Sequence, residues 1–225
     1  MIKIINPASI TDYNRTPEEM EIFLVFAIFV AGRRSDVMAR KVNEMFGDKC
    51  VPSSKPDKVL PSMVEASRLF HWALHDQGMS PLGAINYLKQ ESLLQSLLGY
   101  HKIGQYSRIG KCLAEISSVR GGLHLISNTT VKELEKYSGI GPKTARFFML
   151  HNFGSMRLAV LDTHILSWMA ELVEDHLNRP RGTVPTATPQ SPSTYEFWEL
   201  VWLGHCYKHH VDPAKHDLEL WNERS

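Results

Sequence analysis

The chain has 225 residues, of which 43% are hydrophobic, and a formal net charge of +1 at pH 7. This length and hydrophobic content can form a sizeable core, as one domain or as two lobes. The near-neutral charge excludes any inference of nucleic-acid binding from overall charge, so a basic surface would have to be local.

The first predicted helix begins at Thr16, which is a good N-cap residue and is followed by Pro17 and Glu19 in the capping-box arrangement. The run that follows, residues 21–32, is apolar nearly all round, and this predicts a buried helix. Its longest apolar stretch, residues 22–31, is too short to span a bilayer, and no signal-peptide pattern opens the chain. We therefore expect a cytoplasmic protein with no membrane contact.

Further helices are predicted between punctuating Gly and Pro residues, over residues 37–46, 63–75 and 109–119, with one or two more over residues 82–98. Arg33 and Arg34 lie at the junction before the first of these helices. Lys102 lies in a stretch, residues 98–108, where basic and aromatic residues are interleaved. Such a stretch is typical of a segment that contacts phosphates and bases. It is equally typical of an ordinary polar segment that precedes a helix.

Residues 130–152 predict two short helices joined by a tight turn. Thr130 and Glu133 form a capping box, the turn carries Gly139, Ile140 and Gly141, and Pro142 fits the first position of the second helix. Glycines let a backbone approach a partner closely, and the N-terminal end of a helix receives a phosphate. The same pattern also occurs in plain helix–helix turns, so both interpretations stay open.

Two residues after this turn are candidates for chemistry. Lys143 lies beside a helix N-terminus, where a cation is disfavoured, so its neutral amine is a candidate nucleophile. Asp162 follows an apolar run, residues 158–161, and is the predicted N-cap of a third helix. Taken singly, a solvated lysine and a simple helix cap are the alternative interpretations.

The C-terminal part is predicted to contain a helix to about residue 176, a Pro- and Thr-rich linker over 178–194, and helices over 195–210 and 213–221. No metal is expected at the cluster of ligand-type side chains on the first of this final pair, because neighbouring side chains diverge and no second ligand pair has zinc-like spacing. That cluster consists of His205, Cys206, His209 and His210. Cys50, Cys112 and Cys206 are too widely separated for a disulfide framework or an iron–sulfur cluster.

Three strings together resemble the helix-hairpin-helix DNA glycosylase superfamily. They are GIGPKTA at 139–145, AVLDTHI at 159–165 and DLELW at 217–221, the last resembling the tail of the compact prokaryotic 8-oxoguanine glycosylase/lyases. The resemblance implies an all-α fold of two helical lobes with a cleft between them. We expect residues 1–60 and 165–225 to form one lobe, and residues 61–164, with the helix-hairpin-helix, to form the other.

By the same resemblance, Lys143 attacks the sugar of the damaged nucleotide and Asp162 assists. The residues implied to bind DNA are Gly139, Ile140, Gly141, Thr144, His164, Arg33, Arg34 and Lys102, with Arg33 in the gap left by the extruded nucleotide. Phe147 and Trp221 are implied for the base pocket. The expected partner is double-stranded DNA containing a modified base, bound by a monomer associated with the nucleoid. No cofactor is expected, although a monovalent cation on the hairpin carbonyls is one option.

The expected function is excision of a modified base, 8-oxoguanine first, together with strand cleavage at the resulting abasic site. One alternative is a bulkier hypermodified base, such as a modified cytosine of phage DNA. Only the length of the 178–194 segment suggests this alternative. A second alternative is a non-catalytic helix-hairpin-helix module that only binds DNA. Such a module would need neither Lys143 nor Asp162, and the presence of both argues against it.

Overall fold

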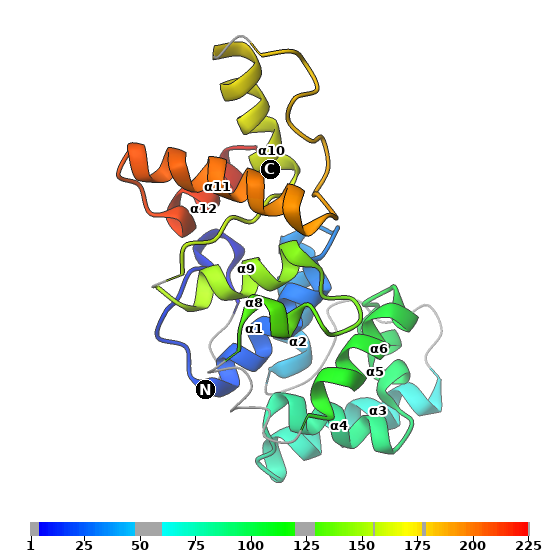
Figure 1. The fold of residues 1–225 in the computed structure, drawn as a ribbon. Coiled ribbons are helices and arrows are strands. Elements are labelled where there is room, and N and C mark those ends of the chain that lie inside the picture. Colours follow the sequence, from blue (N-terminus) through cyan, green and yellow to red (C-terminus); the bar gives the residue numbers. More distant parts are fainter. Residues whose placement is uncertain (1–4, 48–59, 120–128, 155, 177–178, 225) are drawn as a thin grey trace. The chain divides into compact units, whose positions relative to one another are not determined.

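The computed structural model describes residues 5–47, 60–119, 129–154, 156–176 and 179–224. Within these ranges the chain forms helices and no strand, so the predicted all-α class is confirmed (Figure 1). In the same ranges, no helix is both long and apolar enough to cross a membrane.

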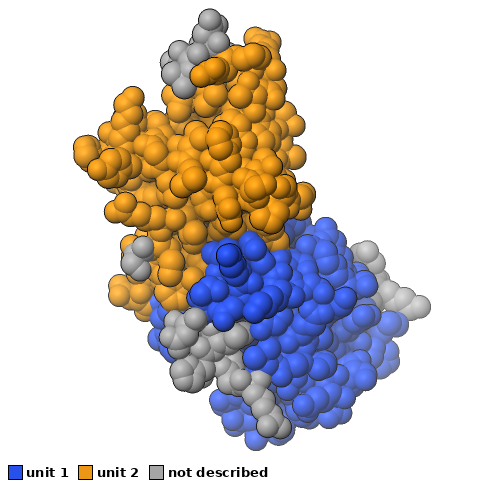
Figure 2. Space-filling model, in the orientation of Figure 1, with its two compact units in different colours: residues 1–7, 15–140 blue, residues 8–14, 141–225 orange. Residues whose placement is uncertain are grey.

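The chain forms two compact units, which Figure 2 colours separately: residues 1–7 with 15–140, called unit 1, and residues 8–14 with 141–225, called unit 2. These boundaries differ from those of the predicted lobes. Residues 15–60 belong with the segment that follows them, and residues 141–164 belong with the C-terminal helices. The division follows from which helices bury their apolar faces against one another, a property that chain order does not determine.

Unit 1 is built around a helix that is buried on nearly all sides. That helix, α1 (Pro17–Val30), begins at the predicted capping box of Thr16 and Glu19 and contacts α2, α4 and α6. The buried carboxylate of Glu21 accepts the backbone N–H of Leu82 at 2.8 Å and so joins α1 to the start of α4. The other helices of unit 1 are α2 (Ser35–Phe46), α3 (Pro61–His71) with a π-helical turn (Trp72–Asp76), α4 (Pro81–Gln90), α5 (Leu94–Tyr100), α6 (Tyr106–Ser117) and α8 (Val131–Leu134).

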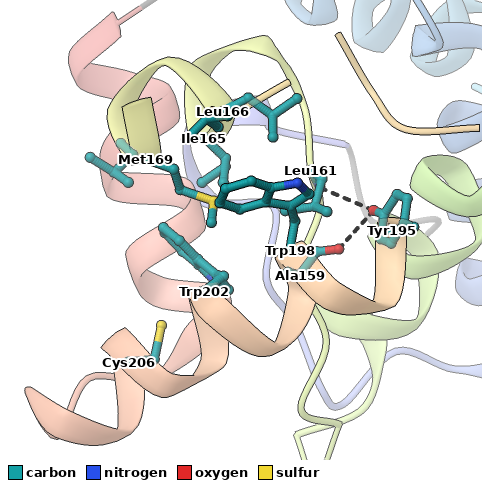
Figure 3. Packing of buried hydrophobic residues seen from close by; sticks show 11 residues of the cluster. Ala159, Leu161, Ile165, Leu166, Met169, Tyr195, Trp198, Trp202 and Cys206 are labelled. Atoms are coloured by element: carbon teal, nitrogen blue, oxygen red, sulfur yellow. Dashed lines mark hydrogen bonds between the residues drawn. The ribbon is translucent and has the colours of Figure 1, made fainter. Parts of the chain in front are cut away.

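Unit 2 contains α9 (Pro142–Asn152), α10 (Thr163–Ala170) with a π-helical turn (Glu171–His176), α11 (Pro192–Lys208) and α12 (Pro213–Arg224). Its core gathers aromatic side chains of α11 around the start of α10 (Figure 3). The helix α12 contacts α9, α10 and α11.

The segment predicted as a linker packs into unit 2 where the structure describes it, over residues 179–191. Val184 is 2% exposed and belongs to the aromatic core. Its backbone N–H donates to the Glu174 carboxylate at 3.0 Å. A Pro- and Thr-rich composition predicted a linker, whereas in the structure Val184 and Pro189 are buried and the Thr188 hydroxyl bonds to the carbonyl of Leu161.

Candidate active site

The turn between α8 and α9 requires glycine at one of its two glycine positions. Gly139 has φ of +93°, and a Cβ there would lie 3.4 Å from the Cβ of Cys112. A residue with a side chain would therefore be strained. Gly141 has an ordinary negative φ and open space around it, and it serves as the N-cap of α9 before Pro142. Ile140 is buried, and its N–H donates to the carbonyl of Tyr137.

Lys143 and Asp162 lie together in unit 2. The Nζ atom of Lys143, in the first turn of α9, is 3.7 Å from Oδ2 of Asp162. The lysine side chain is 37% exposed, whereas that of the aspartate is only 10% exposed. The Oδ1 atom of Asp162 accepts the backbone N–H groups of His164 and Ile165 at 2.9 and 3.0 Å, so the predicted N-cap is confirmed. One carboxylate oxygen is thus committed to capping, and the other faces an accessible amine.

The position of Asp162 is set by the extended segment before it. The hydroxyl of Tyr195 accepts the N–H of Leu161 at 3.0 Å and donates to the carbonyl of Ala159 at 2.8 Å, as Figure 3 shows. The hydroxyl of Thr188 donates to the carbonyl of Leu161 at 2.8 Å. Burial raises the pKa of Tyr195, so this hydroxyl keeps its proton and both of its bonds at neutral pH. Side chains of α11 and of the 179–191 segment therefore hold the backbone that leads into Asp162.

We expect Tyr195→Phe to lower the free energy of unfolding by about 1–3 kcal/mol, because the Leu161 N–H would be left buried and without a partner. The same change should loosen Asp162 and slow any reaction that depends on it. Urea denaturation measures the first effect, and Thr194→Ala, an exposed neighbour on α11, provides the control. A variant as stable as the wild type would contradict this role for the hydroxyl.

A buried ion pair fixes α9 against α11. The Nε atom of Arg146 donates to Oε1 of Glu199 at 2.9 Å, and the guanidinium lies 4.3 Å from the centroid of the Tyr195 ring. The same Glu199 oxygen accepts the N–H of Ala159 at 2.9 Å. Arg146 follows Lys143 by one helical turn, so this pair holds the helix that carries the candidate nucleophile and the segment that leads to Asp162.

Two functional candidates, His151 and Asp217, were missed by sequence reasoning. His151 is fully buried on α9; its Nε2 lies 3.2 Å from Oδ2 of Asp217, and its Nδ1 lies 2.8 Å from the hydroxyl of Thr11. Burial raises the pKa of Asp217, and the carboxyl also interacts electrostatically with Asp162 and Lys143. Asp217 is the first residue of the DLELW string, in which only the tryptophan was considered. Thr11 and His151 belong to no motif that could have pointed to them.

The other predicted site residues of unit 2 lie on the same helices. The rings of His164 on α10 and Trp221 on α12 meet edge to face with centroids 6.5 Å apart. The Phe147 ring lies 4.9 Å from that of His151. Thr144 is buried in the first turn of α9. Helices α9, α10 and α12 therefore bring the predicted pair Lys143 and Asp162 and the predicted aromatic residues into one unit.

The predicted DNA-binding residues of unit 1 have intramolecular partners. The guanidinium of Arg33 donates to the carbonyl of Ile103, and Lys41 donates to the carbonyl of Lys102. Arg34 is exposed and pairs with Asp36 at 2.8 Å. Burial lowers the pKa of Arg33, and the neighbouring Arg108 lowers it further. Basic side chains thus gather around the 101–105 loop. This is a local basic surface, the kind that a chain of near-neutral net charge can have.

Within the ranges that the structure describes, no group of three His, Cys, Asp or Glu side chains could hold a metal ion. In the cluster that was considered for metal, the His205 and His209 rings lie 4.4 Å apart and Cys206 is buried. Cys50 lies outside the described residues.

Comparison of the chain with protein-family models, with curated proteins and with solved structures found no significant match. The function therefore has to be inferred from the residues and their geometry. When protonated, an accessible amine beside an ordered carboxylate is a cation and can bind a phosphate. In its neutral form, the amine can also attack an electrophilic carbon, with the carboxylate stabilising the positive charge that develops.

Proposed function

We propose that this protein is a DNA N-glycosylase with an associated abasic-site lyase activity. The observation that carries the proposal is the pairing of Lys143 and Asp162 at 3.7 Å, at the start of α9 and at the N-cap of α10. Both residues stand in strings that resemble the glycosylase superfamily. A DNA-binding module would need neither residue and would gain nothing from an amine held beside a carboxylate.

In the proposed reaction, the neutral amine of Lys143 attacks C1′ of the sugar. The C1′–N bond breaks, and the base leaves with the bonding electrons and takes up a proton. The ionised carboxylate of Asp162 stabilises the positive charge on the sugar as this bond breaks. Nζ then loses a proton and the C1′–O4′ bond breaks, with O4′ taking up a proton, so that the opened sugar is joined to Lys143 as an imine. The imine permits loss of a C2′ proton and β-elimination of the 3′-phosphate, which cuts the strand.

DNA binding is proposed to use the α8–α9 segment as a helix-hairpin-helix. The backbone N–H groups of Gly141 and Lys143, at the start of α9, would hold a phosphate. His164 and the basic side chains of unit 1 would add phosphate contacts. A flipped nucleotide that enters a cleft between two lobes stays a prediction from the superfamily resemblance.

The proposed base is 8-oxoguanine, since the DLELW string at 217–221 resembles the tail of the glycosylases that remove it. A hypermodified cytosine was suggested only by the length of the 178–194 segment. Residues of this segment pack on the core of unit 2, and the hypermodified base stays the alternative to 8-oxoguanine.

The proposal is tested by borohydride trapping on duplexes that carry 8-oxoguanine, an abasic site or a phage-type modified cytosine. Wild type should form a covalent adduct, and Lys143→Ala should form none, because the reducible imine contains the Lys143 nitrogen. Lys136→Ala, which removes an exposed lysine from the turn before α9, is the matched control and should trap like wild type.

Of the two duplexes that carry a modified base, the one that is trapped faster identifies the base, and the abasic duplex tests the lyase step alone. Base release without any adduct would make water the nucleophile and limit Lys143 to holding DNA. If no duplex reacted and all bound equally well, the protein would be a DNA-binding module.

A further inference from the structure

The outward face of α11 carries exposed apolar side chains. Phe197, Leu200 and Tyr207 are 57%, 69% and 74% exposed, and they are the three most exposed large hydrophobic residues in the part of the chain that the structure describes. Gly204, also exposed, lies between the last two. The four residues are spaced by three, four and three positions, so they lie along one side of the helix, and we call them the α11 stripe.

The α11 stripe lies opposite the face by which α11 packs in unit 2. At 100° per residue, the packed face is about half a helical turn away from the stripe. That packed face belongs to the aromatic core and consists of Tyr195, Trp198, Trp202 and Cys206. The large side chains of the stripe together expose about 400 Å² of surface, and contiguous apolar patches of a few hundred Å² often mark interaction sites.

Two copies of the stripe complement each other when their helices run antiparallel. If the pair is centred at the level of Trp202, Phe197 of one copy lies opposite Tyr207 of the other. In the same register, Leu200 of one copy lies opposite Gly204 of the other. A Cβ placed at Gly204 would meet no atom within 4 Å, so this position leaves space for a leucine side chain of a second copy. Aromatic rings then meet at both ends of the contact, and a leucine fills the space at a glycine twice in the middle.

The charges beside the stripe favour a second copy over DNA. Glu196 and Lys208 are exposed at its two ends. Antiparallel pairing brings Glu196 of each copy to the level of Lys208 of the other, whereas parallel pairing would bring like charges together. The two helix dipoles also oppose each other in the antiparallel arrangement. A surface that binds DNA would need an excess of positive charge, and one acidic and one basic residue do not provide it.

We propose that this protein forms a two-fold symmetric dimer through the α11 stripe, in place of the monomer expected from the superfamily resemblance. The large side chains of both copies would bury about 800 Å², which is below the size of a standard stable interface. The dimer is therefore weak and reversible, with a dissociation constant on the order of 10 μM. The stripe faces away from Tyr195 and Glu199, which hold the backbone before Asp162, so association does not have to alter the Lys143–Asp162 pair.

The test is sedimentation velocity of the full chain at concentrations from about 1 to about 100 μM, a range that brackets the expected dissociation constant. The wild-type mass should rise from 25.6 kDa toward twice that value. Leu200→Glu should raise the dissociation constant at least about tenfold, because the interface would bury an unpaired charge. Val64→Glu changes a 51% exposed residue of α3 in the same way and should dimerise like wild type. Both residues are exposed, so both variants should melt within about 2 °C of wild type.

The register is tested by disulfide cross-linking, with copper phenanthroline as the oxidant, in a Cys50→Ser background whose remaining cysteines, Cys112 and Cys206, are buried. Chains with Leu200→Cys mixed with chains with Gly204→Cys should cross-link several-fold faster than either chain alone. In the proposed register the two different positions face each other, whereas equivalent positions lie about 6 Å apart along the helix axis.

A wild type that stays monomeric over the whole concentration range overturns the inference. A dimer that survives Leu200→Glu also overturns it, as does cross-linking of one single-cysteine chain as fast as the mixture. If Leu200→Glu does not fold, Phe197→Glu replaces it. A monomeric wild type whose affinity for a DNA duplex is lowered by Leu200→Glu would make the stripe a DNA contact instead. The dimer does not depend on the proposed function, because borohydride trapping at Lys143 is read independently of the sedimenting mass.

Discussion

Asp162→Asn should slow base release by about 10²- to 10⁴-fold and leave the fold intact. Asparagine caps a helix as well as aspartate does, so its side-chain oxygen can still accept the N–H groups of His164 and Ile165. What the change removes is the negative charge 3.7 Å from the Lys143 amine. Single-turnover base release on the duplex identified by trapping measures the rate, and thermal unfolding measures stability.

Two further variants separate charge from capping at this position. Asp162→Ala should be as slow as Asp162→Asn and should also lower the free energy of unfolding by about 1 kcal/mol, because the cap is lost. Asp36→Asn, in the first turn of α2, removes an exposed carboxylate in unit 1 and should leave the rate within about twofold of wild type. An Asp162→Asn enzyme as fast as wild type would limit Asp162 to a helix cap.

Glu199→Ala should lower the free energy of unfolding by about 3–5 kcal/mol. The change leaves the buried Arg146 guanidinium without its carboxylate and the Ala159 N–H without its acceptor. Both groups lie where water cannot easily replace the lost partner, so the cost of desolvation is not recovered. For a chain of this length we expect the melting temperature of the transition that includes unit 2 to fall by roughly 10 °C.

The exposed Glu196 on the same helix is the control for this experiment, and Glu196→Ala should change the free energy of unfolding by less than about 0.5 kcal/mol. Replacing both partners, Arg146→Met with Glu199→Leu, should recover part of the loss, because no unpaired charge then remains in the interior. If Glu199→Ala were as stable as Glu196→Ala, the ion pair would not hold α9 on α11.

The starts of α1, α8 and α10 could be predicted from the sequence because each depends on a few consecutive residues, whereas α2, α3, α6 and α11 begin two or three residues before their predicted starts. Thr16 and Thr130 bond to the N–H groups of Glu19 and Glu133, three residues on, and Asp162 caps α10 through the next residues along. The all-α class follows from the same local patterns. The candidate roles of Lys143 and Asp162 came from strings that resemble a known superfamily, and their closeness required the structure.

Local patterns did not predict the π-helical turns or the boundaries of the two units. They also did not predict the ion pairs and hydrogen bonds that position Lys143 and Asp162. Arg146 pairs with Glu199, and His151 joins Thr11 to Asp217, across long stretches of chain whose composition carries no sign of the partner. Residues 179–191 have the composition of a linker, yet Val184 lies among the buried side chains of α10 and α11. Local hydrogen bonds and apolar spacing are properties of the sequence itself, so the sequence determined that the chain is helical, where the helices with side-chain caps begin, and which residues are candidates for chemistry. Burial and the pairing of charges depend on which distant surfaces meet, and only the tertiary structure decided these.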